Sequence, residues 1–322
     1  MKKALLAGSL ILLAAGGGLQ TLTRSVFAEP AAVTQATDVK PAVSPVELLD
    51  PGVEPRQALR FKPVLQTKQL STMSMSMDMS MKSDQANAPM PNTKLPGIVI
   101  KIETTVSQID PNGDIHYQFR YTDINLTEDA KQPPAAAEAM RSQFAKIKDL
   151  TGVIVVDSRG QTKSAKFNVP DSMDSMTRQM LDQMSDSINQ ISVAMPEPAV
   201  GVGAKWRVAS DVSVFGMKLP QAATYEVVKL QNGAAMLKVG LEQQMTNQTM
   251  NLPGLPAASS LEIKSLNTTG QGQMTLSFDR MMPTSAQLAI QSQAEMAITI
   301  SKTEPPMVMN TDTKLDMTLT SE

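Results

Sequence analysis

Five methionines alternate with polar residues in one short stretch of the chain. They occupy every second position from 73 to 81, with serine or aspartate between them. Successive side chains of a β-strand point to opposite faces, so this spacing predicts a strand with five thioethers on one face. The residues are Met73, Met75, Met77, Met79 and Met81.

A row of thioethers on one strand face is compatible with three kinds of chemistry. It can be an ordinary core face. It can line an adaptable apolar groove, because the unbranched, polarizable methionine side chain packs against varied partners. It can also capture Cu(I), for which thioether sulfur is a soft donor, although the chain has no Cys and only one His, His116, to support such a site.

A second methionine stripe lies on a helix predicted over 172–192. Its methionines are spaced by three or four residues, and charged residues occupy the other face, as in an amphipathic helix. Pro170 precedes it, and Asp171 is a plausible N-cap. We expect the two stripes to face a shared space, with the helix contributing Met176, Met180 and Met184 to a ligand-binding groove.

Other chemistry has little support in the sequence. With one His and no Cys, acid–base, nucleophilic and metal chemistry lack their usual residues, and no hydrolase motif is present. The Asp110–Asp114 turn is explained by a hairpin rather than a calcium loop. Gly201–Lys205 lacks the phosphate-loop pattern and precedes a strand. We therefore predict a non-enzymatic protein without a catalytic residue, metal or cofactor.

Strand patterns make up most of the remaining chain. The first half shows alternation over 59–81 and 98–107, a return strand over 115–126 with a bulge near Thr122, and two shorter strands over 152–157 and 161–168. Asn112-Gly113 and Asn232-Gly233 mark tight hairpins. The second half predicts strands over 205–214, 219–230, 234–246, 260–278, 284–300 and 306–320. A first helix is predicted over 135–150.

These elements predict an α+β fold. Short connections favour antiparallel pairing, and strands longer than 12 residues favour a strongly twisted sheet. We expect a long-stranded, strongly curled sheet, a half-barrel or open barrel, with the two helices as a lid.

The N-terminus has the features of a secretory signal peptide over 1–28. Lys2 and Lys3 precede a short apolar run, and Val26-Phe27-Ala28 offers a cleavage site. Residues 29–52 read as a disordered linker, and 53–322 as a single strand-rich domain. After cleavage we expect no permanent membrane span and a periplasmic or secreted protein. The net charge of −2 argues against nucleic acid as a partner.

Three segments resemble an uncharacterised family of secreted bacterial proteins and lipoproteins. They are PRQALRFKPVLQTKQLSTMSMSMDMSM, DPNGDI and MPEPAVGVGAKWRV, and the resemblance extends from Arg56 to Glu322. This family implies no reaction. The order of strands and helices is more distantly similar to the lipoprotein-carrier fold, a half-barrel that holds acyl chains under a helical lid. No functional residue of that fold can be assigned to a position here.

The leading functional hypothesis is an exported protein that binds an apolar or amphiphilic, lipid-like ligand in a methionine-lined groove. The first alternative is a structural or interaction module of the cell envelope, which would bind an envelope protein through exposed strand faces or edges. The second alternative is a Cu(I)-binding protein that uses the strand from Met73 to Met81.

Overall fold

The computed structural model describes seven segments of the chain and a few residues between them. The segments are 45–84, 93–127, 134–171, 194–214, 217–251, 260–299 and 305–322, together with Met173, Asp174, Thr177, Arg178, Leu181 and Ser185. The predicted signal peptide and residues 29–44 of the predicted linker lie outside these residues, so both stay predictions.

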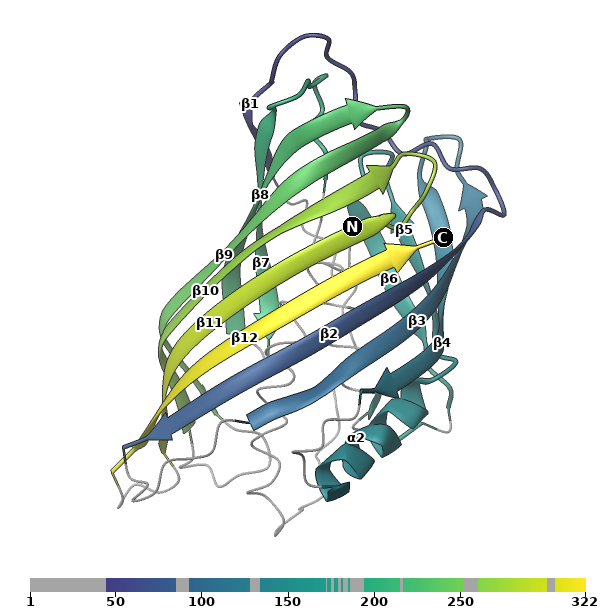
Figure 1. The fold of residues 1–322 in the computed structure, drawn as a ribbon. Helices are drawn as coiled ribbons and strands as arrows, with labels where there is room; N and C mark the ends of the chain where they lie inside the picture. Colours follow the sequence, from purple (N-terminus) through teal and green to yellow (C-terminus); the bar gives the residue numbers. More distant parts are fainter. Residues whose placement is uncertain are drawn as a thin grey trace.

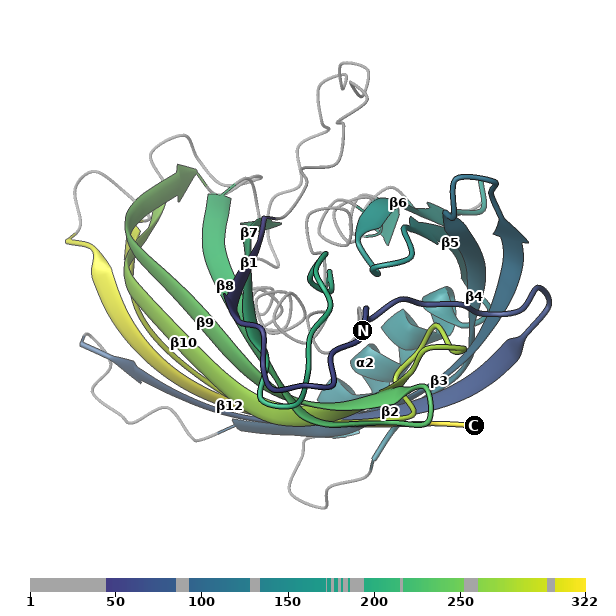
Figure 2. The same ribbon diagram turned by 90° about the horizontal axis from the view of Figure 1, so that it is seen from above.

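The described strands form one antiparallel sheet of twelve strands that curls into an open trough (Figures 1 and 2). The order across the sheet is β1-β7-β8-β9-β10-β11-β12-β2-β3-β4-β5-β6, and β1 and β6 are its two edges. The first six strands are β1 (Val46–Asp50), β2 (Lys68–Ser83), β3 (Thr93–Ile109), β4 (Ile115–Leu126), β5 (Thr151–Val156) and β6 (Thr162–Asn168). The others are β7 (Lys205–Val214), β8 (Met217–Gln231), β9 (Ala234–Asn251), β10 (Ser260–Ser277), β11 (Ser285–Thr299) and β12 (Met307–Ser321).

The alternation of the long strands divides the sheet into a polar convex face and an apolar concave face. In β2 the odd positions from Ser71 to Met79 are buried, whereas the even positions between them are exposed or half-buried. The main core lines the concave face, with contributions from β2–β9 and from β10, β11 and β12. The predicted curled antiparallel sheet is therefore confirmed.

Several local predictions are also confirmed. Strand β7 has the predicted bounds, and β8–β12 agree with the prediction to within a few residues at most ends. Lys101 pairs with Asp123 and Ile102 with Tyr121, so Thr122 is the extra residue of the predicted bulge. Gly113, at the first predicted hairpin, has the positive φ that its turn requires.

The N-terminal part of the domain differs from the prediction. The strand predicted over 59–81 begins only at Lys68, because the backbone before it bonds to loops. Phe61 N–H donates to Ser158 O and Lys62 N–H to Phe278 O, both at 2.7 Å. In addition, Val46–Asp50 forms edge strand β1 against β7, within the segment predicted to be a linker.

The helical lid is smaller than predicted, and the fold is mostly β. Helix α2 (Pro134–Ile147) ends three residues before the predicted end and packs along β4. It is the one helix whose bounds the described residues give. For the second predicted helix, Thr177, Arg178, Leu181 and Ser185 are helical. Thr177 N–H donates to the Asp174 carboxylate at 2.9 Å, so Asp174, rather than Asp171, caps this turn.

Two irregular segments, 51–63 and 194–204, cross the opening of the trough at its upper end; we call them the crossing segments (Figure 2). Gln57 and Val200 exchange two backbone hydrogen bonds of 3.0 Å. Met195 N–H donates to Arg159 O in the β5–β6 turn, and Arg60 donates to Pro196 O at 3.0 Å. The crossing segments therefore connect the β6 side of the open sheet with the β7 side.

Gly272 marks a point where β10 and β11 approach too closely for a side chain. A Cβ there would meet Gln287 O and the backbone of Leu288. We expect Gly272→Ala to lower the free energy of unfolding by about 1–3 kcal/mol, as overpacking does. Urea unfolding measures this change.

Gly240 supplies the control for this substitution. A Cβ there would lie 4.0 Å from Thr224, in ordinary contact, so Gly240→Ala is expected to be neutral or slightly stabilising. Equal destabilisation by the two alanines would contradict the steric explanation.

Candidate ligand-binding face

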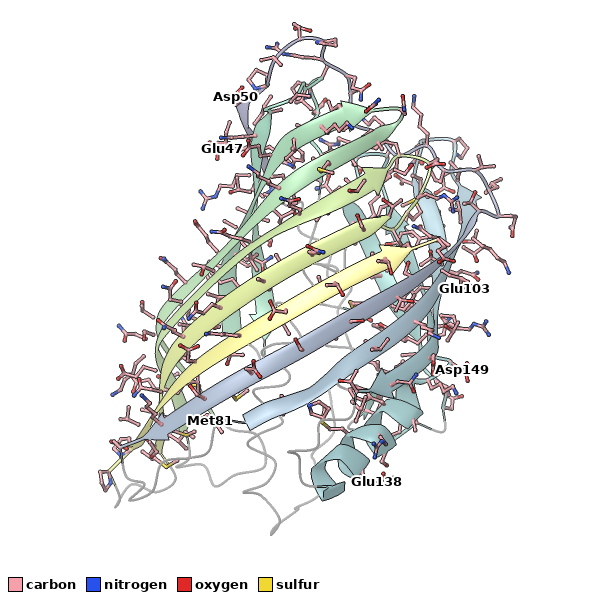
Figure 3. The ribbon with its side chains drawn as sticks, viewed as in Figure 1. Glu47, Asp50, Met81, Glu103, Glu138 and Asp149 are labelled. Carbon is pink, nitrogen blue, oxygen red and sulfur yellow. The ribbon has the colours of Figure 1, made fainter. Side chains whose placement is uncertain are left out.

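The methionines of β2 lie on the concave face. Met73, Met75, Met77 and Met79 are 3–9% exposed and belong to the main core. Met81 is half-buried at the lower end of the sheet, where Figure 3 labels it. The three helical methionines, Met176, Met180 and Met184, lie outside the described residues, so a shared space between the two stripes stays a prediction.

The upper three of the β2 methionines, Met73, Met75 and Met77, have apolar neighbours on both sides, whereas Met79 stands opposite Thr313 of β12. Met75 stands opposite Met317 of β12, and Met77 stands opposite Leu315. Methionines two residues apart on one strand are separated by about 6.6 Å along it, so the backbone sets the sulfurs in a row and does not converge them. This arrangement suits contact with an extended apolar surface.

The lower end of the concave face carries a group of three methionines, of which the sequence analysis predicted only Met81. Two small apolar clusters lie there, apart from the main core. Half-buried Met81, Met296 and Met307 come from β2, β11 and β12, and they pack against these clusters. The alternation within each strand indicates that its methionine lies on the apolar face. It does not indicate that the three methionines are close together, because that depends on the register between the strands.

Burial opposes ionisation of the phenols near the concave face. It raises the pKa of Tyr121 to about 12, and it also raises the pKa values of Tyr117 and Tyr225. These hydroxyls therefore stay uncharged to a higher pH than the hydroxyl of an exposed tyrosine.

The single histidine lies away from the lower-end methionines, at the β3–β4 hairpin. His116 Nε2 is 2.8 Å from Asp110 Oδ2, and this hydrogen bond holds the pKa of the Asp110 carboxyl below its usual range. Among the described residues, no three His, Cys, Asp or Glu side chains form a group that could hold a metal ion.

Gly201–Lys205 enters strand β7, as predicted. A Cβ at Gly201 would meet the backbone of Val53, so a glycine is needed where the two crossing segments touch. Gly203 has a positive φ of 83° and turns the chain into the strand. Trp206, which follows Lys205, is 1% exposed and anchors the core.

A separate hollow of about 920 Å³ lies over strands β7–β12. Its lining includes Gly240 and Gly272, where side chains are missing, and exposed polar residues such as Lys238, Gln271 and Gln273. These polar side chains belong to the convex face, although buried Met317 of the main core also lines the hollow. Because this hollow is open to solvent, it would enclose little of an apolar ligand.

No helix in the described part of the chain is long and apolar enough to cross a membrane.

No protein-family profile and no curated protein matches the chain in sequence. Among solved structures, two mutants of the Rh. blastica porin align at 8% and 9% identity, with TM-scores of 0.21 and 0.20. Each alignment covers 78% of this chain and 100% of the porin. TM-scores this low establish neither a shared fold nor a shared function.

Proposed function

We propose that the protein is an exported, non-enzymatic carrier that holds an apolar or amphiphilic, lipid-like ligand on the concave face of its sheet. In this proposal the buried methionines of β2 form the floor of a methionine-lined groove. The half-buried methionines at the lower end line its entrance.

The observation that carries the proposal is the lower end of the concave face. The crossing segments cover the upper end, whereas at the lower end Met81, Met296 and Met307 remain partly exposed on three different strands. Apolar side chains that stay partly accessible on a concave face are typical of sites for apolar ligands. Methionine suits such a site because it adapts to chains of different shape.

The test is binding of 11-(dansylamino)undecanoic acid, whose emission rises when it leaves water. We expect saturable binding to the purified protein. Met296→Gln and Met307→Gln place a polar amide where the acyl chain enters, so each should weaken binding by about tenfold.

Met236→Gln is the matched control, because Met236 is 36% exposed on the convex face. This variant should bind the probe as the parent protein does. Circular dichroism melting establishes that all three variants are folded. The proposal is wrong if the parent protein does not bind the probe, or if all three substitutions have the same effect on binding.

A further inference from the structure

A row of buried polar side chains crosses the apolar concave face. Gln221 of β8 pairs in register with Gln243 of β9, and Gln243 pairs with Thr268 of β10. Thr268 pairs with Ser292 of β11, which pairs with Thr313 of β12. These five side chains, here called the polar row, are only 3–7% exposed.

Apolar rows flank the polar row on both sides. The row above it contains Leu241, Ile290, Leu315 and Met77, all in the main core. The row below it contains Met245, Leu266 and Ala294, which belong to a separate apolar cluster. The polar row therefore lies between the main core and the methionine-rich lower end.

Hydrogen bonds within the polar row use only part of its capacity. Gln243 Nε2 donates to Gln221 Oε1 at 2.6 Å, and the Thr268 and Ser292 hydroxyls are 2.8 Å apart. Within the described part of the chain, the Gln221 amide NH₂, the Gln243 amide oxygen and the Thr313 hydroxyl make no further side-chain hydrogen bond. Buried polar groups normally have partners, so this row is incomplete without one.

The row consists of amides and hydroxyls and carries no ionisable group. The charged residues next to it in sequence lie on the convex face: Glu242 and Lys314 are exposed, and Asp312 is half-buried and accepts a hydrogen bond from Gln293. A buried charge without a partner is strongly unfavourable, so an ionised head group does not suit this site. A neutral group that both donates and accepts hydrogen bonds does.

We propose that the polar row binds the uncharged ester or hydroxyl group of an amphiphile such as a monoacylglycerol, while the flanking apolar rows contact its chain. This inference rests on the proposed carrier function and adds the class of ligand. The hydroxyls and amides act as donors and acceptors toward the ligand, and no covalent step is involved.

The experiment uses diphenylhexatriene, a wholly apolar fluorescent probe, bound to the full chain. Monoolein, 1-octadecene and oleate compete for the site. We expect monoolein to displace the probe at a concentration about tenfold lower than either competitor, because a site built for hydrogen bonding rejects ligands that lack the matching group. Thr268→Val/Ser292→Ala should reduce this preference to about twofold or less and leave displacement by 1-octadecene unchanged.

Thr269→Val changes the neighbouring, exposed convex residue and is the matched control. Thr313→Val provides a second test should the double variant not fold. The Thr313 hydroxyl bonds to no other described side chain, so its removal should disturb the fold less. This variant should lower the preference for monoolein about threefold. Probe binding without a preference for monoolein, or with a preference that both row variants retain, overturns this inference alone. Failure of the parent protein to bind any of the compounds overturns the carrier function together with it.

Discussion

Trp206→Ala is expected to lower the free energy of unfolding by about 3–5 kcal/mol, the usual cost of removing a buried aromatic side chain. Trp206 is 1% exposed, and its ring stacks on Tyr225 with centroids 5.4 Å apart. Its Nε1–H donates to Ala194 O at 3.2 Å, at the start of the second crossing segment. The substitution therefore removes core volume and an anchor of this segment together.

Urea unfolding followed by far-ultraviolet circular dichroism measures the effect, since the chain has no other tryptophan to report by fluorescence. Trp206→Phe keeps much of the ring but loses the N–H donor, so its cost should be clearly smaller. A change of less than about 1 kcal/mol for Trp206→Ala would be incompatible with a core that depends on this side chain.

Gln69→Leu is expected to cost about 2–5 kcal/mol, although leucine is apolar and similar in size. Gln69 is 4% exposed on the concave side of β2. Its Nε2 donates to Met282 O and its Oε1 accepts from Met282 N–H, both at 2.9 Å. Leucine would leave two buried backbone groups without partners, and each costs roughly 1–3 kcal/mol.

Gln273→Leu is the matched control, because Gln273 is exposed on the convex face. It should change the stability by less than about 0.5 kcal/mol. Thermal and urea unfolding of both variants provide the comparison. If Gln69→Leu were as stable as Gln273→Leu, the two hydrogen bonds from Gln69 to the β10–β11 turn would make no net contribution to the free energy of unfolding.

The strands were largely predictable because their information is local. Alternation between one apolar and one polar face is visible within each strand, and Asn232-Gly233 marks where one ends. The bulge at Thr122 was predictable for the same reason, since the apolar positions change parity there. The alternation of Leu59 and Phe61 was misleading. Buried residues of an irregular crossing segment can give the same alternating apolar pattern in the sequence as residues of a strand.

The candidate site was predictable only in part. The β2 methionines were placed on the apolar face, but Met296 and Met307 were missed, and so was the polar row. Gln221, Gln243, Thr268, Ser292 and Thr313 each look like a single polar interruption of an apolar pattern. Their alignment depends on the register of five strands, which no single strand specifies.

The position of β12 has a consequence for the order in which the sheet can form. β12 lies between β11 and β2, and Ser321 contacts Ser71 across 250 residues of sequence. The two halves of the sheet therefore join only after the chain has been synthesised as far as β12. Contacts of such long range slow folding, so we expect closure of this seam to be a slow step.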